Sequence, residues 1–454
     1  MAALPDTPPL HEKGDELPAA DLPLLVQAEA TREGSDVPPE APVPLLLEAP
    51  EAESAEVAVQ HETVTPSIVP TPGPLSTLEI VNPLPTPCFE IRDVHDLDWA
   101  AIREAAQPLD IRARMRSTVE GLEALLDRAN GPGMLFDNDR ADAADRAIHV
   151  GRETQESVPL WIIGDLHGDL LALEAALALI AAKAQEGENT QQRIVFLGDF
   201  FDDEGSGLEV LLRIYELILT AAGCVCIVVG NHDEALSYDG VRFASSVSPC
   251  DFSDFLNANL AHEWIERAGK LAVRLFAQAP RALFFPSGLL VSHGGFPLSD
   301  LHERLTETGN WNDAACLSDF VWTRAHPKAR RKLPNRFSRG SQFGYEDFAA
   351  FCELSTRLKR PVTHMIRGHD HVEDRYAIYP AYHAHPVLTT VALSRRLPRE
   401  TFGPRERVPT LVRVLEGATV QVHRMHIPND LIHDVYPEPS AVNDSSAPAA
   451  EVPS

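Results

Sequence analysis

The sequence predicts an α/β fold, and two observations carry this prediction. Short apolar runs alternate with segments of helical periodicity between residues 157 and 430, and five of the apolar runs end in glycine beside Asp, Asn or His. Strands separated by helices are typical of parallel sheets, whose ligands bind beyond the carboxyl ends of the strands. We therefore expect a catalytic domain over 157–430 with its site at these strand ends.

Helical periodicity begins before the alternating part of the chain. Apolar residues recur at spacings of three and four over 99–106 and 111–129, and Asn130-Gly131-Pro132-Gly133 ends the second pattern. These segments predict two helices in a lead-in, residues 93–156, that packs on the catalytic domain.

Within the catalytic domain each element follows from composition and periodicity. Helices are expected where apolar residues recur over a dozen or more positions, and strands where short runs are rich in Val, Ile and Leu. The expected strands are Leu160–Ile163, 193–197, 224–229, Leu289–Ser292 and 364–366, and the expected helices are 170–182 and 208–222. A loop and a helix over 237–259 are expected above the site.

The two ends of the chain have a different composition. Residues 1–90 hold 17 of the 37 prolines and carry 16 acidic against 2 basic side chains, half of the net charge of −28. Proline blocks helix propagation and like charges repel, so residues 1–92 are predicted to be an acidic, Pro-rich disordered tail. The return of Pro, Ala, Ser and acidic residues predicts a second disordered tail over 431–454.

Composition also excludes several classes of function. The acidic surface argues against sequence-independent binding of nucleic acid, which needs clusters of Lys and Arg. The longest apolar stretches are interrupted by Glu174 and by Arg213 and Glu216, so no membrane span is expected, and the N-terminus lacks the features of a secretory signal. Six scattered cysteines favour buried thiols in a reducing compartment, so we expect a cytoplasmic protein.

The residues at the strand ends predict a metal site. Each Gly-Asp or lone His is by itself a common turn or structural feature, but five in succession offer carboxylate, amide oxygen and imidazole, with no thiolate. This mixed set suits Mn²⁺, Fe or Zn, of which Mn²⁺ is our first expectation. The ligands are too many for one ion, and a bridging carboxylate would hold two ions about 3.5–4 Å apart, as in phosphate-ester hydrolysis.

The same motifs resemble a known family. They occur in the order Gly164-Asp165-Leu166-His167-Gly168, Gly198-Asp199-Phe200-Phe201-Asp202, Gly230-Asn231-His232-Asp233, His293-Gly294-Gly295 and Arg367-Gly368-His369. This order resembles the calcineurin-like metallophosphoesterases, and among them the PPP serine/threonine protein phosphatases most. Arg339-Gly340-Ser341-Gln342-Phe343-Gly344 and the stretch after the last histidine strengthen the resemblance, which covers roughly 158–395. It implies a central β-sandwich flanked by helices.

The resemblance also implies a role for each matching residue. Asp165 and His167 would bind the first metal and Asp199 would bridge, while the second metal would be bound by Asn231, His293 and His369. His232 would protonate the leaving alkoxide, with Asp202 orienting its imidazole and raising its pKa. The expected substrate ligands are Arg339 and Arg324.

Three positions depart from the family pattern. Asp203 stands where the pattern has a phosphate-binding Arg, so another cation is needed, for which Arg324 and Arg242 are candidates. Asp233 replaces a Glu, a milder change. His371 makes the last motif similar to the Gly-His-x-His of the wider superfamily, in which the second histidine binds the first metal; a solvated loop residue is the alternative reading.

Together these observations predict a metal-dependent hydrolase that cleaves phosphomonoesters by attack of a metal-bound hydroxide, and most nearly a serine/threonine protein phosphatase. Its expected partners are a phosphoprotein or a small phosphorylated substrate, together with a possible protein partner of the acidic tail. Two alternatives stay open: a nucleotide-directed hydrolase such as a diadenosine tetraphosphatase, and a weakened phosphatase-like scaffold that recruits partners through its tail.

Overall fold

The computed structural model describes residues 84, 87–128, 133–151, 158–186, 192–330, 340–400, 403–415 and 419–437. All of them belong to one compact unit, Glu79–Ser454. The expected acidic tail lies outside the described residues up to residue 83, as does the end of the chain from residue 438.

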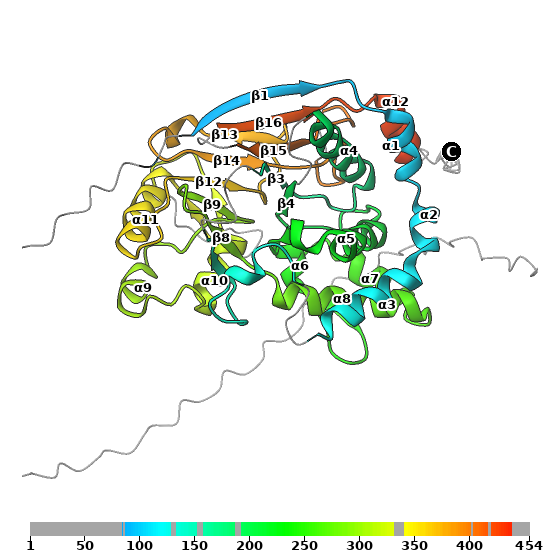
Figure 1. Cartoon of the computed structure of the whole chain (residues 1–454), viewed down its shortest axis with the longest axis horizontal. Helices are drawn as coiled ribbons and strands as arrows, with labels where there is room; N and C mark the ends of the chain where they lie inside the picture. Colours follow the sequence, from blue (N-terminus) through cyan, green and yellow to red (C-terminus); the bar gives the residue numbers. More distant parts are fainter. Residues whose placement is uncertain are drawn as a thin grey trace, which may run out of the picture. The chain divides into compact units, whose positions relative to one another are not determined.

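Two six-stranded sheets form the centre of this unit (Figure 1). The first sheet has the order β1-β16-β15-β3-β4-β5 and the second the order β13-β14-β12-β9-β8-β2. The strands of the first are β1 (Cys88–Val94), β3 (Leu160–Ile163), β4 (Arg193–Phe196), β5 (Val225–Ile227), β15 (Thr410–Val414) and β16 (Thr419–Met425). Those of the second are β2 (Ala147–His149), β8 (Ala282–Phe284), β9 (Leu289–Ser292), β12 (His364–Arg367), β13 (Tyr376–Ile378) and β14 (Val387–Thr390).

The order of β3, β4 and β5 follows from the helices that connect them. These strands are parallel neighbours, joined by α4 (Leu170–Glu186) and α5 (Gly207–Ala221). Parallel strands require such crossovers, and their carboxyl ends come to one edge of the sheet. In the second sheet β9 and β12 are likewise parallel neighbours. The loops that carry the predicted motifs therefore follow strands of both sheets.

Successive side chains of a strand point to opposite faces of its sheet, so the apolar residues form three layers. Ile162, Val195 and Val412 of the first sheet pack with Val291 and Ile366 of the second in one buried cluster between the sheets. The opposite faces of both sheets are covered by helices, which give the other two layers of core. This layered arrangement confirms the α/β class and the helix-flanked sandwich that the resemblance implies.

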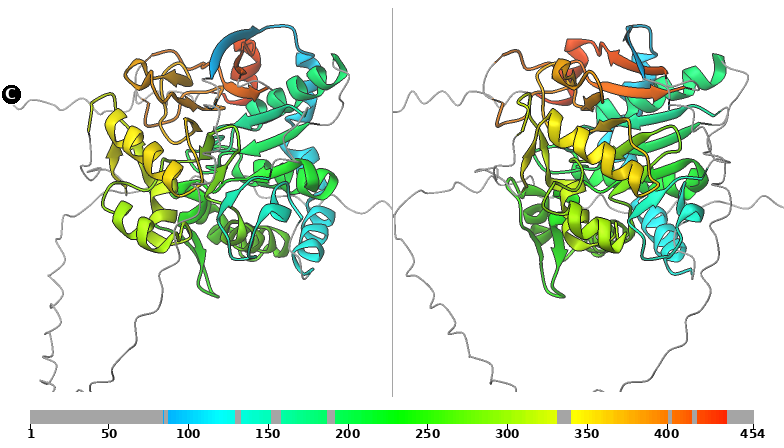
Figure 2. Two further views of the ribbon diagram at one scale, coloured as in Figure 1. Left: turned by 60° about the vertical axis from the view of Figure 1, so that its left-hand side comes forward. Right: turned by 90° about the vertical axis from the view of Figure 1, so that its left-hand side faces the viewer.

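Helices of different parts of the chain cover the two outer faces (Figures 1 and 2). The first sheet is covered by α4, α5, α1 (Trp99–Ala105), α2 (Pro108–Ala113), α3 (Met115–Leu126), α8 (Glu263–Gln278) and α12 (Asn429–Val435). The second is covered by α9 (His302–Thr308), α10 (Ala314–Trp322) and α11 (Tyr345–Arg357). The short elements α6 (Asn231–Ala235), β6 (Leu236–Tyr238), β7 (Phe243–Ser245), α7 (Asp251–Ala258), β10 (Arg324–Ala325) and β11 (Gln342–Phe343) lie in the connections.

Three expected segments differ from the structure in more than their end residues. The predicted helix 111–129 is broken at Arg114, whose backbone (φ −95°, ψ 0°) separates α2 from α3. The tail expected over 1–92 includes most of β1, because this segment gains a strand partner in β16. The tail expected from residue 431 includes part of α12, where Leu431 and Ile432 are buried against the first sheet's helical layer. In each case the observed structure depends on tertiary packing, which local composition does not reveal.

Two other sequence expectations concern cysteines and membranes. All six cysteines are free, and Cys226, Cys316 and Cys352 are buried. Among the described residues, every helix is too short or too polar to cross a bilayer.

Candidate metal centre

Five loops at the ends of central strands bring the predicted ligands together. Asp165 and His167 follow β3, and Asp199 follows β4. Asn231 and His232 are the first two residues of α6, which follows β5, so they lie at the same edge of the first sheet. The second sheet contributes His293 after β9 and both His369 and His371 after β12. All of these side chains are buried except His371, whose side chain is 13% exposed.

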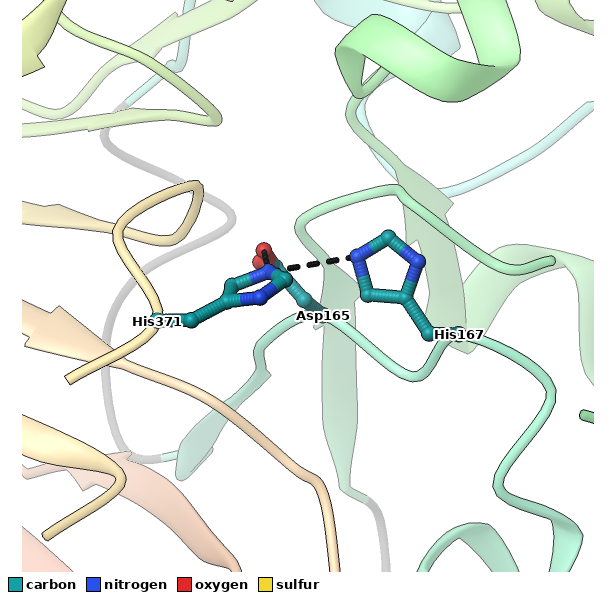
Figure 3. Close-up of side chains that lie close together, drawn as sticks. All are labelled: Asp165, His167 and His371. Carbon is teal, nitrogen blue, oxygen red and sulfur yellow. Dashed lines mark hydrogen bonds and ion pairs between the residues drawn. The ribbon is translucent and has the colours of Figure 1, made fainter. Parts of the chain in front are cut away.

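Asp165, His167 and His371 form a first cluster of ligand atoms (Figure 3). The Nε2 atom of His371 lies 3.2 Å from Nε2 of His167 and 3.2 Å from Oδ2 of Asp165. Figure 3 shows the two imidazoles reaching this point from different segments of the chain. The structure thus places His371 beside the residues proposed for the first metal rather than in a solvated loop.

Asp199, His293 and His369 form a second cluster. Nε2 of His293 lies 3.1 Å from Nδ1 of His369, 3.1 Å from Oδ1 of Asn231 and 3.4 Å from Oδ2 of Asp199. Four donor atoms of the types expected for a mixed oxygen and nitrogen site therefore converge on one point.

Asp199 stands between the two clusters. The Oδ2 atom that approaches His293 also lies 3.6 Å from Nε2 of His167. The other carboxylate oxygen accepts a hydrogen bond from the backbone N–H of His232 at 2.9 Å. Oδ2 of Asp199 thus approaches one histidine of each cluster.

The tautomers of two histidines fit a metal site. Nδ1 of His167 lies 3.0 Å from the carbonyl oxygen of Phe201, and Nδ1 of His293 lies 2.8 Å from that of Leu197. Each carbonyl can only accept, so each Nδ1 carries the proton and each Nε2 presents its lone pair to the cluster. Histidines that ligate metals are commonly oriented in this way.

Burial and neighbouring charges set the protonation of the centre. Burial lowers the pKa of His167 and of His369 well below the ordinary value, which keeps both imidazoles neutral. Burial also opposes the charge on His293, but Asp199 and Asp165 outweigh it and raise its pKa to about 9. For Asp199, burial favours the neutral acid, yet the charges of His293 and His232 hold its pKa well below the usual range. Neutral His167 and His369 beside ionised Asp199 are forms that bind divalent metals, and His293 would release its proton on binding one.

The backbone around the centre is strained. Among the described residues, nine residues other than glycine have positive φ, and six of them lie in these loops: His167, Asp199, Asp202, Asp203, Glu204 and His369. Such conformations are costly and persist only where the surroundings hold them, and they cluster at functional sites.

Glycine is required at two positions for close approach rather than for a turn. A Cβ atom at Gly230 would lie 2.2 Å from Oδ1 of Asp199, and one at Gly368 would lie 2.2 Å from Oδ1 of Asp165. The carboxylates of both clusters can therefore reach their positions only against bare backbone.

His232 and Asp202 form a hydrogen-bonded pair beside the clusters. Nδ1 of His232 lies 2.6 Å from Oδ2 of Asp202, and the other oxygen of Asp202 accepts from the backbone N–H of Phe252 at 2.9 Å. Burial lowers the pKa of His232, but the charges of Asp199 and Asp202 and the hydrogen bond to Asp202 outweigh it, so the pKa is raised. The ring centroids of His232 and His167 are 4.9 Å apart, so this imidazole faces the first cluster.

The predicted substrate residues are placed less uniformly. Arg339 lies outside the described residues. Nη1 of Arg324 donates to the carbonyl oxygen of His369 at 2.8 Å and to Asp370 at 3.1 Å, so this arginine positions the second cluster. The side chain of Arg242 is 74% exposed and lies 3.9 Å from Asp239. Asp233 accepts from the backbone N–H groups of Asp199 and Gly230, both at 2.8 Å, and thus joins two ligand loops.

One pair near the centre was not anticipated as a pair. Asp203 is buried, and its Oδ2 lies 3.2 Å from Nδ1 of His167 and 2.9 Å from Nη2 of Arg399. Asp203 was noted in the sequence only as a departure from a family pattern. The signal in the sequence is the acidic residue at position 203, because a carboxylate that is buried there needs a positively charged partner.

Comparison with known proteins supplies the family. Residues 158–373, which include every ligand of both clusters, match the family model "Calcineurin-like phosphoesterase". This part of the chain is a calcineurin-like phosphoesterase domain. The chain is accordingly a metal-dependent phosphoesterase, and the fold and enzyme class expected from the sequence are confirmed.

Solved structures similar to the phosphoesterase chain include three phosphatases or hydrolases of low sequence identity. A protein serine/threonine phosphatase from Saccharomyces cerevisiae with similarity to human phosphatase PP5 is 15% identical (70% of this chain and 89% of that chain covered, TM-score 0.43). A cold-active protein-tyrosine phosphatase of a psychrophilic Shewanella is 17% identical (59% and 80%, TM-score 0.33). A putative diadenosine tetraphosphatase is 12% identical (61% and 97%, TM-score 0.31). No curated protein matches the sequence significantly.

Proposed function

We propose that this phosphoesterase is a two-metal phosphomonoesterase of the PPP type, with phosphoserine and phosphothreonine in proteins as its first substrate class. The observation that carries the proposal is the position of Asp199, whose Oδ2 faces His293 of one cluster and His167 of the other. A carboxylate shared between imidazoles of both clusters supports two ions rather than one.

The ligand sets follow from the two clusters. Asp165, His167 and His371 would hold one ion, Asn231, His293 and His369 the other, and Asp199 both. When bound, divalent ions supply Lewis-acid stabilisation of a phosphoryl group and lower the pKa of water. The donor types fit Mn²⁺, Fe and Zn, of which we propose Mn²⁺.

The protein's own acid is His232. Its imidazole is buried beside the first cluster, and Asp202 holds Nδ1 so that the opposite nitrogen, Nε2, is the one free to donate a proton. A phosphomonoester leaves as an alkoxide, which needs that proton, so His232 would act as the general acid and Asp202 as its positioning residue. We also propose that Arg339 and Arg324 contribute to substrate binding.

The proposal is tested with protein stripped of metal and reloaded with Mn²⁺. Turnover of p-nitrophenyl phosphate, a phosphoserine/threonine peptide and diadenosine tetraphosphate is compared at equal metal content. We expect metal-dependent turnover led by the phosphopeptide. Turnover led by the dinucleotide would replace the protein-phosphatase proposal with a nucleotide hydrolase.

A variant separates acid catalysis from metal binding. His232→Asn should keep two bound ions while slowing turnover about 10²–10⁴-fold, the usual range for a general acid. The absence of metal-dependent turnover on all three substrates, with two ions bound, would refute the proposal and favour a scaffold.

A further inference from the structure

Asp203, the residue after Asp202, places a further negative charge beside His232, where a substrate phosphate would approach the centre. Asp203 is buried and is a second carboxylate beside His232, where the family pattern has a cation. The pKa of Asp203 is raised, because the effect of burial outweighs that of the positive charge of Arg399. A phosphate dianion approaching this point would be repelled unless the counter-charge faces it.

Arg399 supplies that counter-charge from a distant part of the chain. Its Nη2 donates to Oδ2 of Asp203 at 2.9 Å and lies 3.4 Å from Nδ1 of His371. The residue is 196 positions away from Asp203. The guanidinium therefore lies on the outer side of the His371 ring. The opposite nitrogen of that ring, Nε2, faces the first cluster.

The guanidinium of Arg399 is only partly used by the protein. Its side chain is 43% exposed, and within the described part of the chain its hydrogen bonds involve Nη2 alone. Nε and Nη1 therefore keep donors that point to no protein acceptor among these residues.

Arg395 keeps this segment in place. Its Nη2 donates to the carbonyl oxygens of Asp203 at 2.9 Å and of His167 at 3.0 Å. The segment that carries Arg399 is thereby fixed to the loop of Asp165 and His167 and to the loop of Asp199 and Asp203. Arg324, the other candidate cation, lies at the second cluster, where its Nη1 donates to the carbonyl oxygen of His369 and to Asp370.

We propose that Arg399 binds the phosphoryl group of the substrate, and that Asp203 is the positioning residue that holds its guanidinium at the first metal site. The cation expected at position 203 is thus supplied from position 399, with the carboxylate in its former place acting as its anchor. Arginine suits this role because its planar fork donates two parallel hydrogen bonds to phosphate oxygens. The proposal rests on the phosphoesterase function proposed above.

The test measures phosphate binding without turnover. Full-length His232→Asn protein loaded with Mn²⁺ is titrated calorimetrically with inorganic phosphate, alone and with Arg399→Gln added. We expect Arg399→Gln to weaken phosphate binding at least about 10–100-fold, the range for the loss of one charge-assisted hydrogen bond, with two ions still bound. Arg396→Gln, in the same segment, is the matched control and should leave the affinity unchanged.

Kinetics then distinguish a binding role from a structural one. In protein with His232 intact, Arg399→Gln should raise KM for p-nitrophenyl phosphate far more than it lowers kcat, and Arg399→Lys should restore part of the loss. Asp203→Asn should also raise KM, by a smaller factor, because it releases the guanidinium without removing it.

The outcomes are distinct from those that test the proposed function. Phosphate affinity in Arg399→Gln equal to that of its parent, with two ions bound, would overturn the role of Arg399 even if the enzyme hydrolyses phosphomonoesters. An Arg399-dependent phosphate affinity in a protein that hydrolyses none of the three substrates would support the binding site and refute the proposed activity.

Discussion

Replacing Asp202 by Asn tests how His232 is kept ready to donate a proton. In the protein the carboxylate accepts from Nδ1 of His232 at 2.6 Å inside the fold. An asparagine can still accept the backbone N–H of Phe252 through its oxygen, but it then turns its amide N–H toward Nδ1. A donor facing Nδ1 disfavours the imidazolium, which is the form that the general acid needs.

The magnitude follows from the loss of one buried, charge-assisted hydrogen bond. Such a bond contributes about 1.5–3 kcal/mol, which corresponds to roughly one to two pKa units. Asp202 raises the pKa of His232, so activity that requires protonated His232 is present below this pKa and is lost as pH rises through it. Asp202→Asn should therefore move the basic limb of the profile about one to two units toward lower pH, and lower kcat/KM above that limb about 10–100-fold.

The assay is kcat/KM for p-nitrophenyl phosphate as a function of pH, with bound metal measured by mass spectrometry. Two ions should remain, since Asp202 contacts His232 and Phe252 rather than the clusters. In a His232→Asn background the same substitution should have almost no further effect, because the pair acts as a unit. A basic limb that stays in place, or an equal further loss in that background, would refute the argument.

Three further predictions address the metal centre and the termini. Asp199→Asn should reduce bound metal below two ions per chain by elemental analysis, because the bridging position loses its charge; two retained ions would contradict the bridge. Gly368→Ala should lower both metal content and Tm, since its Cβ would meet Asp165 at 2.2 Å, with an overpacking cost of about 1–3 kcal/mol. Its control is Gly223→Ala, where no atom lies within 4 Å of the added Cβ. Deletion of residues 1–83 should leave aryl phosphatase activity near that of the full chain, whereas deletion of 1–94, which removes β1, should lower Tm by several degrees; equal Tm values would deny β1 a structural role.

Much of the fold could be predicted because the central strands are short, continuous apolar runs buried on both faces. Leu160–Ile163 and Leu289–Ser292 occur with the predicted bounds. Strands with mixed exposure were not predicted: β1 has exposed and half-buried residues, and β13 is half-buried throughout. Their existence depends on partners that are distant in sequence, which local composition does not encode.

The residues of the site likewise include some that the sequence predicts and some that it does not. Its ligands were predictable because each stands in a short motif at the end of a strand, and the shared edge brings them together. The Asp203–Arg399 pair could not be predicted from spacing, because no local pattern relates residues 196 positions apart. The motif of His371 fits either a ligand of the first metal or a solvated loop residue, so the sequence alone does not decide its role. Its distance of 3.2 Å to both His167 and Asp165 favours ligation.

The pairing of β1 with β16 has a consequence for synthesis of the chain. Cys88 is paired with Thr419, so one strand leaves the ribosome long before its partner. β15, which separates β16 from β3, is equally late. Every proposed ligand precedes residue 372, so the nascent chain presents the whole ligand set while one edge of β3 is still open. Open edges are prone to pair with other chains, and translation that stops before residue 410 would leave this edge exposed. Completion of the first sheet therefore follows the synthesis of every proposed ligand.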